Sequence, residues 1–232
     1  ALASRPGTAA GSGTGAARAA QDEAPAASPK REPIRRAVLV GVDGYATPAD
    51  FPPLTVAHAS IRCLAQVLEE AEGGGFEVTS LFDPTDEQLQ TVLLTFFRAP
   101  DLGPEDVLLL YFAGHALIGE ENDLYLCPQN ASAPPLDGTG VSLVWLAGRA
   151  INKCPAENLL IVFDCQYRSA PGRGVDCDVG SVLHANLGQG KAKFLLSSST
   201  VLDAPVLQGT GPSLVADRMA RGIAFWEAAE DD

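Results

Sequence analysis

The sequence lacks any long apolar run. Its longest ones, residues 107–112 and 159–163, are far shorter than the roughly 20 residues that a membrane-spanning helix needs. The first residues, ALASRPGTAAGSGTG, also lack the charged stretch followed by an apolar one that is typical of a secretory signal peptide. We therefore expect no membrane association and a cytoplasmic location.

Basic residues are scarce. Lys and Arg together number 16 against 29 Asp and Glu, which gives a formal net charge of −13. A chain of this charge repels phosphate backbones, so we expect no nucleic acid among its partners.

The cysteines show no pattern typical of a metal site or a disulfide framework. The five are Cys63, Cys127, Cys154, Cys165 and Cys177. Their number is odd, no two form a C-x-x-C pair, and no histidine stands beside such a pair. We therefore expect reduced thiols, no metal and no cofactor, as is usual in the cytoplasm.

What the sequence does contain is enough apolar material for one folded domain. Hydrophobic residues make up 46% of the 232 positions. Residues 1–36 are mostly Ala, Gly, Ser, Pro and charged residues, so a disordered tail or linker is predicted there. The folded domain is predicted over residues 37–226, and the acidic residues 227–232 are predicted to be a solvated tail.

Within the domain, apolar runs of strand type alternate with segments of helical spacing. The predicted helices are 56–71, 85–98, 143–152 and 213–229. The predicted strands are 37–43, 106–115, 158–165 and 192–199, together with one in 73–83 that follows a glycine-rich helix stop. This alternation predicts an α/β fold in which helices cover both faces of a mostly parallel sheet. No Gly-x-Gly-x-x-Gly follows the first strand, which disfavours a doubly wound binder of nucleotides or other small molecules.

Two of the predicted strands end in residues that can do chemistry. The third ends at Gly114-His115 and the fourth at Asp164-Cys165. Active sites of such sheets lie beyond the carboxyl ends of the strands, so neighbouring strands would bring His115 and Cys165 within hydrogen-bonding reach. A histidine there favours the thiolate of a cysteine and can later protonate a leaving amine. The pair is thus a candidate base and nucleophile of a cysteine peptidase.

Several motifs, in this order, resemble those of the caspase-like cysteine peptidases, in particular the bacterial caspase-family and metacaspase branch. They are GVDGY (41–45), YFAGHA (111–116), DLYLCP (123–128), DCQYRSA (164–170) and FLLSSSTVLDAP (194–205). The resemblance covers about residues 36–226 and implies a caspase-like three-layer sandwich. It implies a large-subunit-like half at about 37–170, a loop at 171–190 that includes His184, and a small-subunit-like half at 191–226. It also implies a protein or peptide as substrate or partner, and pairing of two copies through the edge of the sheet.

The match departs from the family pattern at the site itself. The resemblance implies a nucleophile two residues after the motif Asp, where this chain has Gln166. Successive side chains of a strand point to opposite faces, so Asp164 and Gln166 share one face and Cys165 takes the other, unless the chain turns at Asp164. The glycine whose N–H is implied to hold the oxyanion is replaced by Ala116. Of the two acids implied for a pocket that prefers Arg or Lys, Asp164 is present and Ser60 stands at the other position.

Three functions therefore remain open. The first is a caspase-like module with weakened or lost peptidase activity, a pseudoprotease that regulates or scaffolds a partner. The second is an active endopeptidase with His115 as base and acid, Cys165 as nucleophile, Ala116 at the oxyanion site and Asp164 in the substrate pocket. The third is the doubly wound small-molecule binder. We expect the first, because several elements of the catalytic pattern are replaced together.

Overall fold

The computed structural model describes residues 31–70, 74–132, 136, 138–170, 178–187, 193–199 and 207–230. The chain divides into one unit that ends at Glu32 and a second that begins at Pro33. The fold below is that of the second unit.

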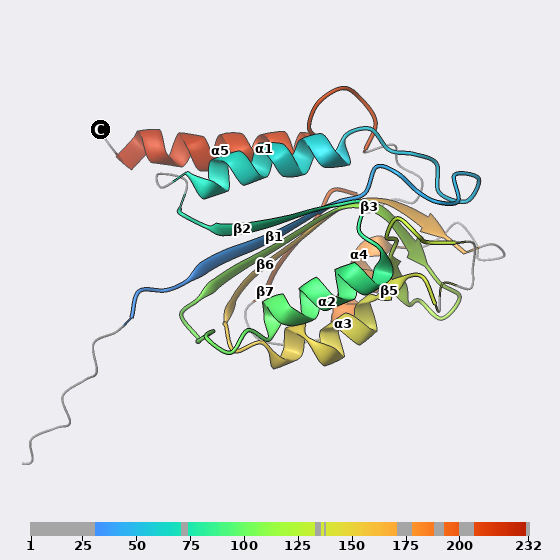
Figure 1. The fold of residues 1–232 in the computed structure, drawn as a ribbon, viewed down its shortest axis with the longest axis horizontal. Coiled ribbons are helices and arrows are strands. Elements are labelled where there is room, and N and C mark those ends of the chain that lie inside the picture. Colours follow the sequence, from blue (N-terminus) through green and yellow to red (C-terminus); the bar gives the residue numbers. More distant parts are fainter. Residues whose placement is uncertain are drawn as a thin grey trace, which may run out of the picture. The chain divides into compact units, whose positions relative to one another are not determined.

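One sheet of seven strands organises the described part of this unit (Figure 1). The strands are β1 (Arg35–Gly41), β2 (Glu77–Phe82), β3 (Val107–Ile118), β4 (Leu124–Leu126), β5 (Val141–Ser142), β6 (Asn158–Ser169) and β7 (Lys193–Ser197). Five of them run parallel in the order β2-β1-β3-β6-β7. The short strands β4 and β5 are antiparallel and extend the sheet beside the last residues of β3.

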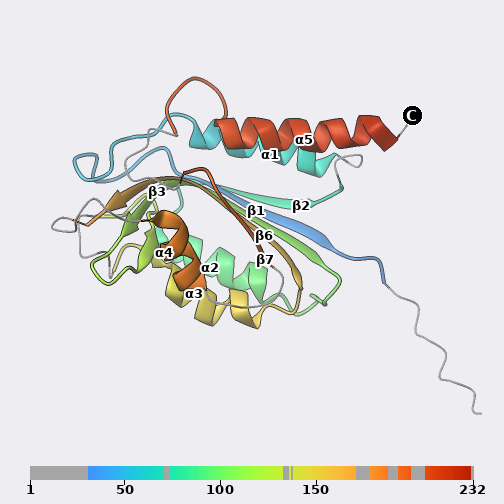
Figure 2. The ribbon, with the colours of Figure 1, turned by 180° about the vertical axis from the view of Figure 1, so that it is seen from behind.

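Helices cover both faces of the sheet, as Figure 1 and the reverse view in Figure 2 show. The helices are α1 (Ala57–Glu69), α2 (Asp86–Phe97), α3 (Leu143–Arg149), α4 (Val179–Leu187) and α5 (Leu214–Glu230), with a short 3₁₀ turn at Ile151–Lys153. Helices α1 and α5 lie side by side on one face, and α2, α3 and α4 lie on the other. The predicted α/β three-layer arrangement is confirmed.

Local sequence explains why these elements form. The central strand β3 is buried over almost its whole length, because helices cover it above and below and its sequence from Val107 onward is nearly all apolar. Helix α2 begins at a capping box, in which the Thr85 hydroxyl accepts from the Gln88 N–H and the Gln88 side chain accepts from the Thr85 N–H. The helix predicted over residues 85–98 is found at Asp86–Phe97.

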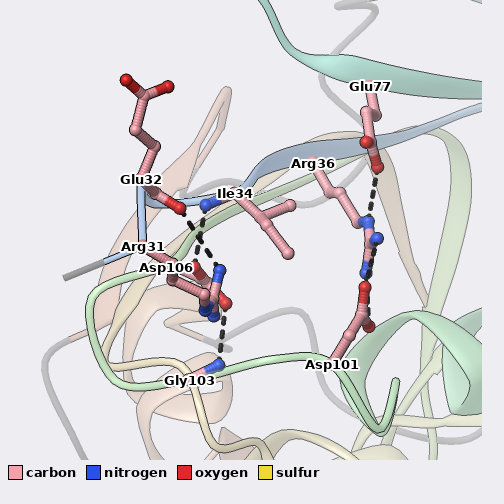
Figure 3. A network of polar contacts seen from close by, with 8 residues as sticks. All are labelled: Arg31, Glu32, Ile34, Arg36, Glu77, Asp101, Gly103 and Asp106. Atoms are coloured by element: carbon pink, nitrogen blue, oxygen red, sulfur yellow. Dashed lines mark hydrogen bonds and ion pairs between the residues drawn. The ribbon is translucent and has the colours of Figure 1, made fainter. Parts of the chain in front are cut away.

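Side chains tie down the amino ends of the central strands (Figure 3). The Arg36 guanidinium donates to both carboxylate oxygens of Asp101, at 2.9 and 2.7 Å, and to Glu77 at 2.7 Å. The two acids come from the neighbouring strand β2 and from the loop before β3. Arg36 therefore links β1, β2 and the loop before β3 at the amino ends of the strands.

A second carboxylate at this edge is fully buried. Asp106, directly before β3, accepts from the main-chain N–H groups of Ile34 at 2.8 Å and Gly103 at 2.7 Å (Figure 3). The Asp106 carboxylate thus provides hydrogen-bond partners for two main-chain N–H groups beside the starts of β1 and β3.

The structure corrects several predicted boundaries. Strand β1 starts at Arg35, inside the predicted tail, whose residues 1–30 lie outside the described part. Part of the predicted loop at 171–190 is helix α4, and the exposed His184 lies on it. Residues 171–177 and 188–190 of that loop lie outside the described part. Strands β3 and β6 do not end at the predicted positions: they continue to Ile118 and Ser169.

Candidate functional site

The candidate site lies at the point along β3 where its pairing with β1 ends and its pairing with β4 begins. Its partner β1 ends at Gly41, opposite Ala113, and β4 begins to pair at Ala116. In between, Tyr45 fills the gap, and its hydroxyl accepts the main-chain N–H of His115 at 2.8 Å. The chain after β1 thus closes over the residue that the sequence singles out.

The imidazole of His115 is held in one orientation. Its Nε2 lies 2.8 Å from the Pro52 carbonyl oxygen, and its ring contacts Tyr45 at 4.9 Å and Phe51 at 5.7 Å between centroids. A carbonyl only accepts, so Nε2 carries the proton and Nδ1 presents a lone pair. Burial lowers the pKa of His115, which keeps the ring neutral near pH 7. Nδ1 has no hydrogen-bond partner among the described residues. The geometry is that of an oriented base.

Opposite this base stands an amide. Strands β3 and β6 pair in parallel, with His115 in register with Gln166 and Gly114 in register with Cys165. Residues in register share a face, so Gln166 lies on the same face as His115. Gln166 Oε1 is buried and has no partner within the described part of the chain. As predicted, Asp164 and Gln166 share a face.

Asp164 links that face to the two helices that cover it. Its Oδ2 accepts from the Tyr111 hydroxyl at 2.6 Å and from the Ser213 hydroxyl. Ser213 stands before α5 and its oxygen accepts the Ala216 N–H, while its own N–H donates to Ser60 Oγ at 2.8 Å. Ser60 thus lies in the cluster around Asp164.

One carboxylate oxygen of Asp164 is left over. Asp164 is 1% exposed, and its Oδ1 has no hydrogen-bond partner among the residues described. Ser198, which follows β7 and whose N–H donates to the Phe163 carbonyl, likewise has a buried hydroxyl without a partner in the described part. Buried polar atoms normally have partners, so these unpaired atoms mark this end of the sheet as the candidate site.

Cys165 lies on the other side of the sheet. It is fully buried, and its sulfur lies 3.9 Å from the Phe112 carbonyl oxygen. Burial, followed by the nearby Asp164 charge, raises the pKa of its thiol well above the usual value. The structure therefore does not bring Cys165 within reach of the His115 ring. The reason is that β6 runs on through Ser169 without the turn at Asp164 that this contact requires.

The N–H of Ala116 is also directed into the sheet. The His115 N–H and carbonyl bond to Tyr45 and to the Cys127 N–H, both on the β1 and β4 side of β3. Main-chain groups alternate along a strand, so the Ala116 N–H points to the opposite side, toward β6. Ala116 is fully buried there, in register with Tyr167.

Sequence reasoning missed Arg168. It follows Gln166 by two residues, so it lies on the same face, and it donates to the main-chain carbonyl of Asp50. The half-buried Arg168 charge is close enough to contribute to the lowered pKa of His115, after the larger effect of burial. The signal that could have found it is the two-residue period of a strand that continues past Cys165.

Two further properties concern only the described residues. They contain no group of three or more His, Cys, Asp or Glu side chains that could hold a metal ion. No helix among them combines the length and apolar character needed to cross a membrane.

Comparisons with known proteins agree with this architecture. A crystal structure of a structural-genomics target protein from Geobacter sulfurreducens has a similar fold, with a TM-score of 0.52 and 15% sequence identity over 82% of this chain and 81% of that one. No curated protein matches the sequence significantly. A family model described as the caspase domain matches residues 34–216. That match spans most of the chain, including all seven strands, and this protein therefore belongs to the caspase-domain family.

Proposed function

We propose that this caspase domain is a binding module without peptidase activity. It holds a protein or peptide segment at the carboxyl ends of β3 and β6, and acts through that contact as a regulatory or scaffold component. One observation carries the proposal: the side chain in register with His115 is Gln166, and the nearest cysteine in the sequence, Cys165, is buried on the opposite face.

The chemistry of the face supports this function. A base is present, because His115 offers a lone pair at Nδ1, but an amide side chain cannot attack a carbonyl carbon. A thiol attacks as the thiolate, and the raised pKa of Cys165 keeps it protonated. An oxyanion would also need a free N–H, and that of Ala116 is directed toward β6.

Activation of Cys165 would need a large rearrangement. A shift of β6 by one residue would turn every side chain of the strand to the opposite face. The aromatic residues Phe163 and Tyr167, both fully buried, would then have to exchange places with polar neighbours. We regard the His115–Cys165 peptidase as the less favoured alternative for this reason.

The segment that binds carries a basic side chain. Resemblance to the metacaspase-type pocket assigns Asp164 to an acid that attracts Arg or Lys, and its unpaired Oδ1 is an acceptor for such a donor. Ser60 in the place of the second acid halves the charge of that pocket. Weaker attraction for a basic side chain is in keeping with reversible binding.

The test uses Gln166→Cys, which places a thiol in register with His115. Each cysteine is mapped by iodoacetamide labelling between pH 5 and 9, alongside cleavage assays on peptides that contain Arg, Lys or Asp. In the wild type we expect no cleavage and no labelling of native Cys165. In Gln166→Cys we expect a new, reactive thiol whose labelling slows when His115 is also changed to Ala.

Two results would count against the proposal. Wild-type cleavage that disappears in Cys165→Ala and survives in Gln166→Ala would establish the peptidase. Rapid labelling of Cys165 at low pH, lost in His115→Ala, would show that thiol and imidazole meet in solution.

A further inference from the structure

The connection between β1 and α1 supplies the hydrogen bonds that orient His115. We name its residues 43–54 the His115 loop. From this loop, the Tyr45 hydroxyl accepts the His115 N–H and the Pro52 carbonyl accepts from His115 Nε2, both at 2.8 Å. The orientation of His115 therefore depends on how this loop is held.

One side chain outside the site holds the start of the loop. Asp83, the residue after β2, uses its Oδ1 atom to accept the main-chain N–H groups of Asp43 at 2.8 Å and of Gly44 at 3.1 Å. Its own N–H donates to the Gly41 carbonyl at 2.9 Å, so Asp83 is fixed to the end of β1 as well. These bonds set the path of the chain into Tyr45, because Gly44 directly precedes it.

The backbone of Asp83 has a conformation that few residues adopt. Its φ is 46°, in the left-handed region that is uncommon for residues with a side chain. Asp and Asn tolerate this region better than most residues, and glycine, which has no Cβ, enters it freely. Strained backbone persists where the surrounding structure holds it in place. Position 83 therefore needs both a residue that accepts a positive φ and an acceptor oxygen, which Asp and Asn combine.

The next residue supports the other side of Tyr45. The Pro84 carbonyl accepts the Gln129 N–H at 2.9 Å, and the Gln129 carbonyl accepts the Ala46 N–H at 2.8 Å. Both neighbours of Tyr45 are thus held from the same connection between β2 and α2. Tyr45 is buried, so a change at this connection reaches His115 through a closely packed side chain.

A second carboxylate closes the base of the loop. Asp43 accepts the main-chain N–H groups of Ala57 at 2.9 Å and His58 at 3.1 Å, at the start of α1. Its carbonyl accepts the Leu54 N–H at 2.9 Å. The His58 ring lies between the two acids, with Nδ1 3.5 Å from Asp43 Oδ2 and Nε2 3.0 Å from Asp83 Oδ1. The two carboxylates thus connect the loop to α1 and to β2.

We infer that Asp83 is a positioning residue of the candidate site. Its carboxylate holds the His115 loop in the path that places the Tyr45 hydroxyl and the Pro52 carbonyl against His115. It thereby fixes the tautomer in which Nδ1 of His115 carries the lone pair. The inference is independent of the proposed binding function, because it concerns how His115 is held and not what His115 acts on.

Nuclear magnetic resonance of the full chain with isotopically labelled histidine tests the inference. The chain has three histidines, His58, His115 and His184, and the ring signals missing from His115→Ala are those of His115. In the wild type we expect a single tautomer with the proton on Nε2. We also expect a titration midpoint below the usual value near ~6.5, because burial and, to a smaller degree, the Arg168 charge lower the pKa of His115.

Two substitutions at position 83 separate its two features. Asp83→Gly permits the positive φ and removes the acceptor oxygen, whereas Asp83→Asn keeps both. In Asp83→Gly we expect His115 to lose its single tautomer and to give the averaged signals of a mixture of both. Its titration midpoint should rise toward the usual value as the loop exposes the ring. Asp83→Asn should keep the wild-type signals.

Asp106→Gly is the matched control. Asp106 likewise accepts two main-chain N–H groups, those of Ile34 and Gly103, but it lies at the amino ends of the strands. The control should lower the free energy of unfolding, measured by urea denaturation, as Asp83→Gly does. It should leave the tautomer and the titration midpoint of His115 unchanged.

Two results would overturn the inference. One is a folded Asp83→Gly variant in which His115 keeps its tautomer and its titration midpoint. The other is an equal change in Asp106→Gly, which would report a general loosening of the fold. If Asp83→Gly does not fold, Gly44→Pro takes its place, because it removes one of the two N–H donors and leaves Asp83 intact. The same signals and the same contradicting results then apply.

Discussion

At the scale of single residues, His115 and Cys165 point to opposite faces of the sheet because their positions on the paired strands differ by one residue. His115 faces a row of unpaired polar atoms, and Cys165 packs beneath the sheet beside the Phe112 carbonyl. The difference comes from the strand's period of two, since neither residue is near a chain turn. Two side chains that the ends of neighbouring strands were expected to bring together therefore lie on opposite faces of the sheet.

The buried thiol of Cys165 predicts a specific loss of stability at high pH. The pKa of the Cys165 thiol is raised in the folded state. The protonated thiol therefore contributes its full stabilisation below the pKa of the unfolded chain, near ~8.5, and this stabilisation is lost as the pH rises above that value. The free energy of unfolding should fall by up to about 1.4 kcal/mol per pH unit for this group. Cys165→Ala should be less stable at pH 7.5, by about 1 kcal/mol, and the gap should close by pH 10.

The measurement is urea unfolding of both proteins from pH 7.5 to 10 under reducing conditions. Cys127 is buried with a raised pKa as well, so both proteins should lose stability, and only the difference between them reports on Cys165. If the free energies of unfolding of the wild type and of Cys165→Ala changed in parallel with pH, this thiol would ionise as easily in the folded chain as in the unfolded one.

At the scale of elements, the carboxyl end of β1 depends on a close approach to α1. A Cβ on Gly41 would lie 2.9 Å from the Ala57 carbonyl oxygen, and backbone cannot move aside as a side chain can. Gly41→Ala should therefore destabilise the protein by about 1–3 kcal/mol. Gly148, exposed on α3 with no neighbour within 4 Å of its Cβ position, is the matched control, and Gly148→Ala should stabilise by up to about 1 kcal/mol. Chemical denaturation measures both, and a loss of similar size in both variants would contradict this account.

Much of the element order follows from sequence because its signals are local. Apolar runs, helical spacing and the capping residues of α2 are all visible in the chain. The sequence predicts a loop in place of α4 because the flanks of this helix are rich in Gly and charge. The buried residues of the helix have helical spacing nonetheless: Val179, Val182, Leu183 and Leu187. The extension of β3 past His115 is paired on one side with β4, in a short hairpin, and on the other with β6. The pairing with β6 joins residues about fifty positions apart, which no local pattern reveals.

The site was predictable in part for the same reason. The shared face of Asp164 and Gln166 follows from strand periodicity alone. The carbonyl of Pro52 that orients His115 could not be foreseen, because it belongs to an irregular segment. Arg168 was missed because β6 was expected to end before it.

At the scale of the whole molecule, the sheet presents an apolar edge. Among the described residues β7 pairs with β6 alone, and Phe194, Leu195 and Leu196 are 72%, 39% and 43% exposed. An edge strand of this kind is a template for pairing with another chain. We expect two copies to associate here.

Leu195→Lys tests the edge, since a charge there opposes pairing. Sedimentation equilibrium should show dimers in the wild type and monomers in this variant. Val144→Lys is the control, because Val144 is 48% exposed on α3, away from this strand. The Val144→Lys variant should dimerise as the wild type does. A wild type that stays monomeric, or a dimer unaffected by Leu195→Lys, would rule out this edge.

The buried and ion-paired amino end of the sheet has a mechanical consequence. Strand β1 lies between β2 and β3, parallel to both, and Arg36 grips two other segments at its start. A pulling force applied at Pro33 acts along β1. It therefore strains the hydrogen bonds of β1 to β2 and to β3 all at once, in shear, and does not open them one after another. Forced unfolding is governed by the unfolding rate, so the two ladders and the Arg36 ion pairs should slow the extraction of β1 under such a load.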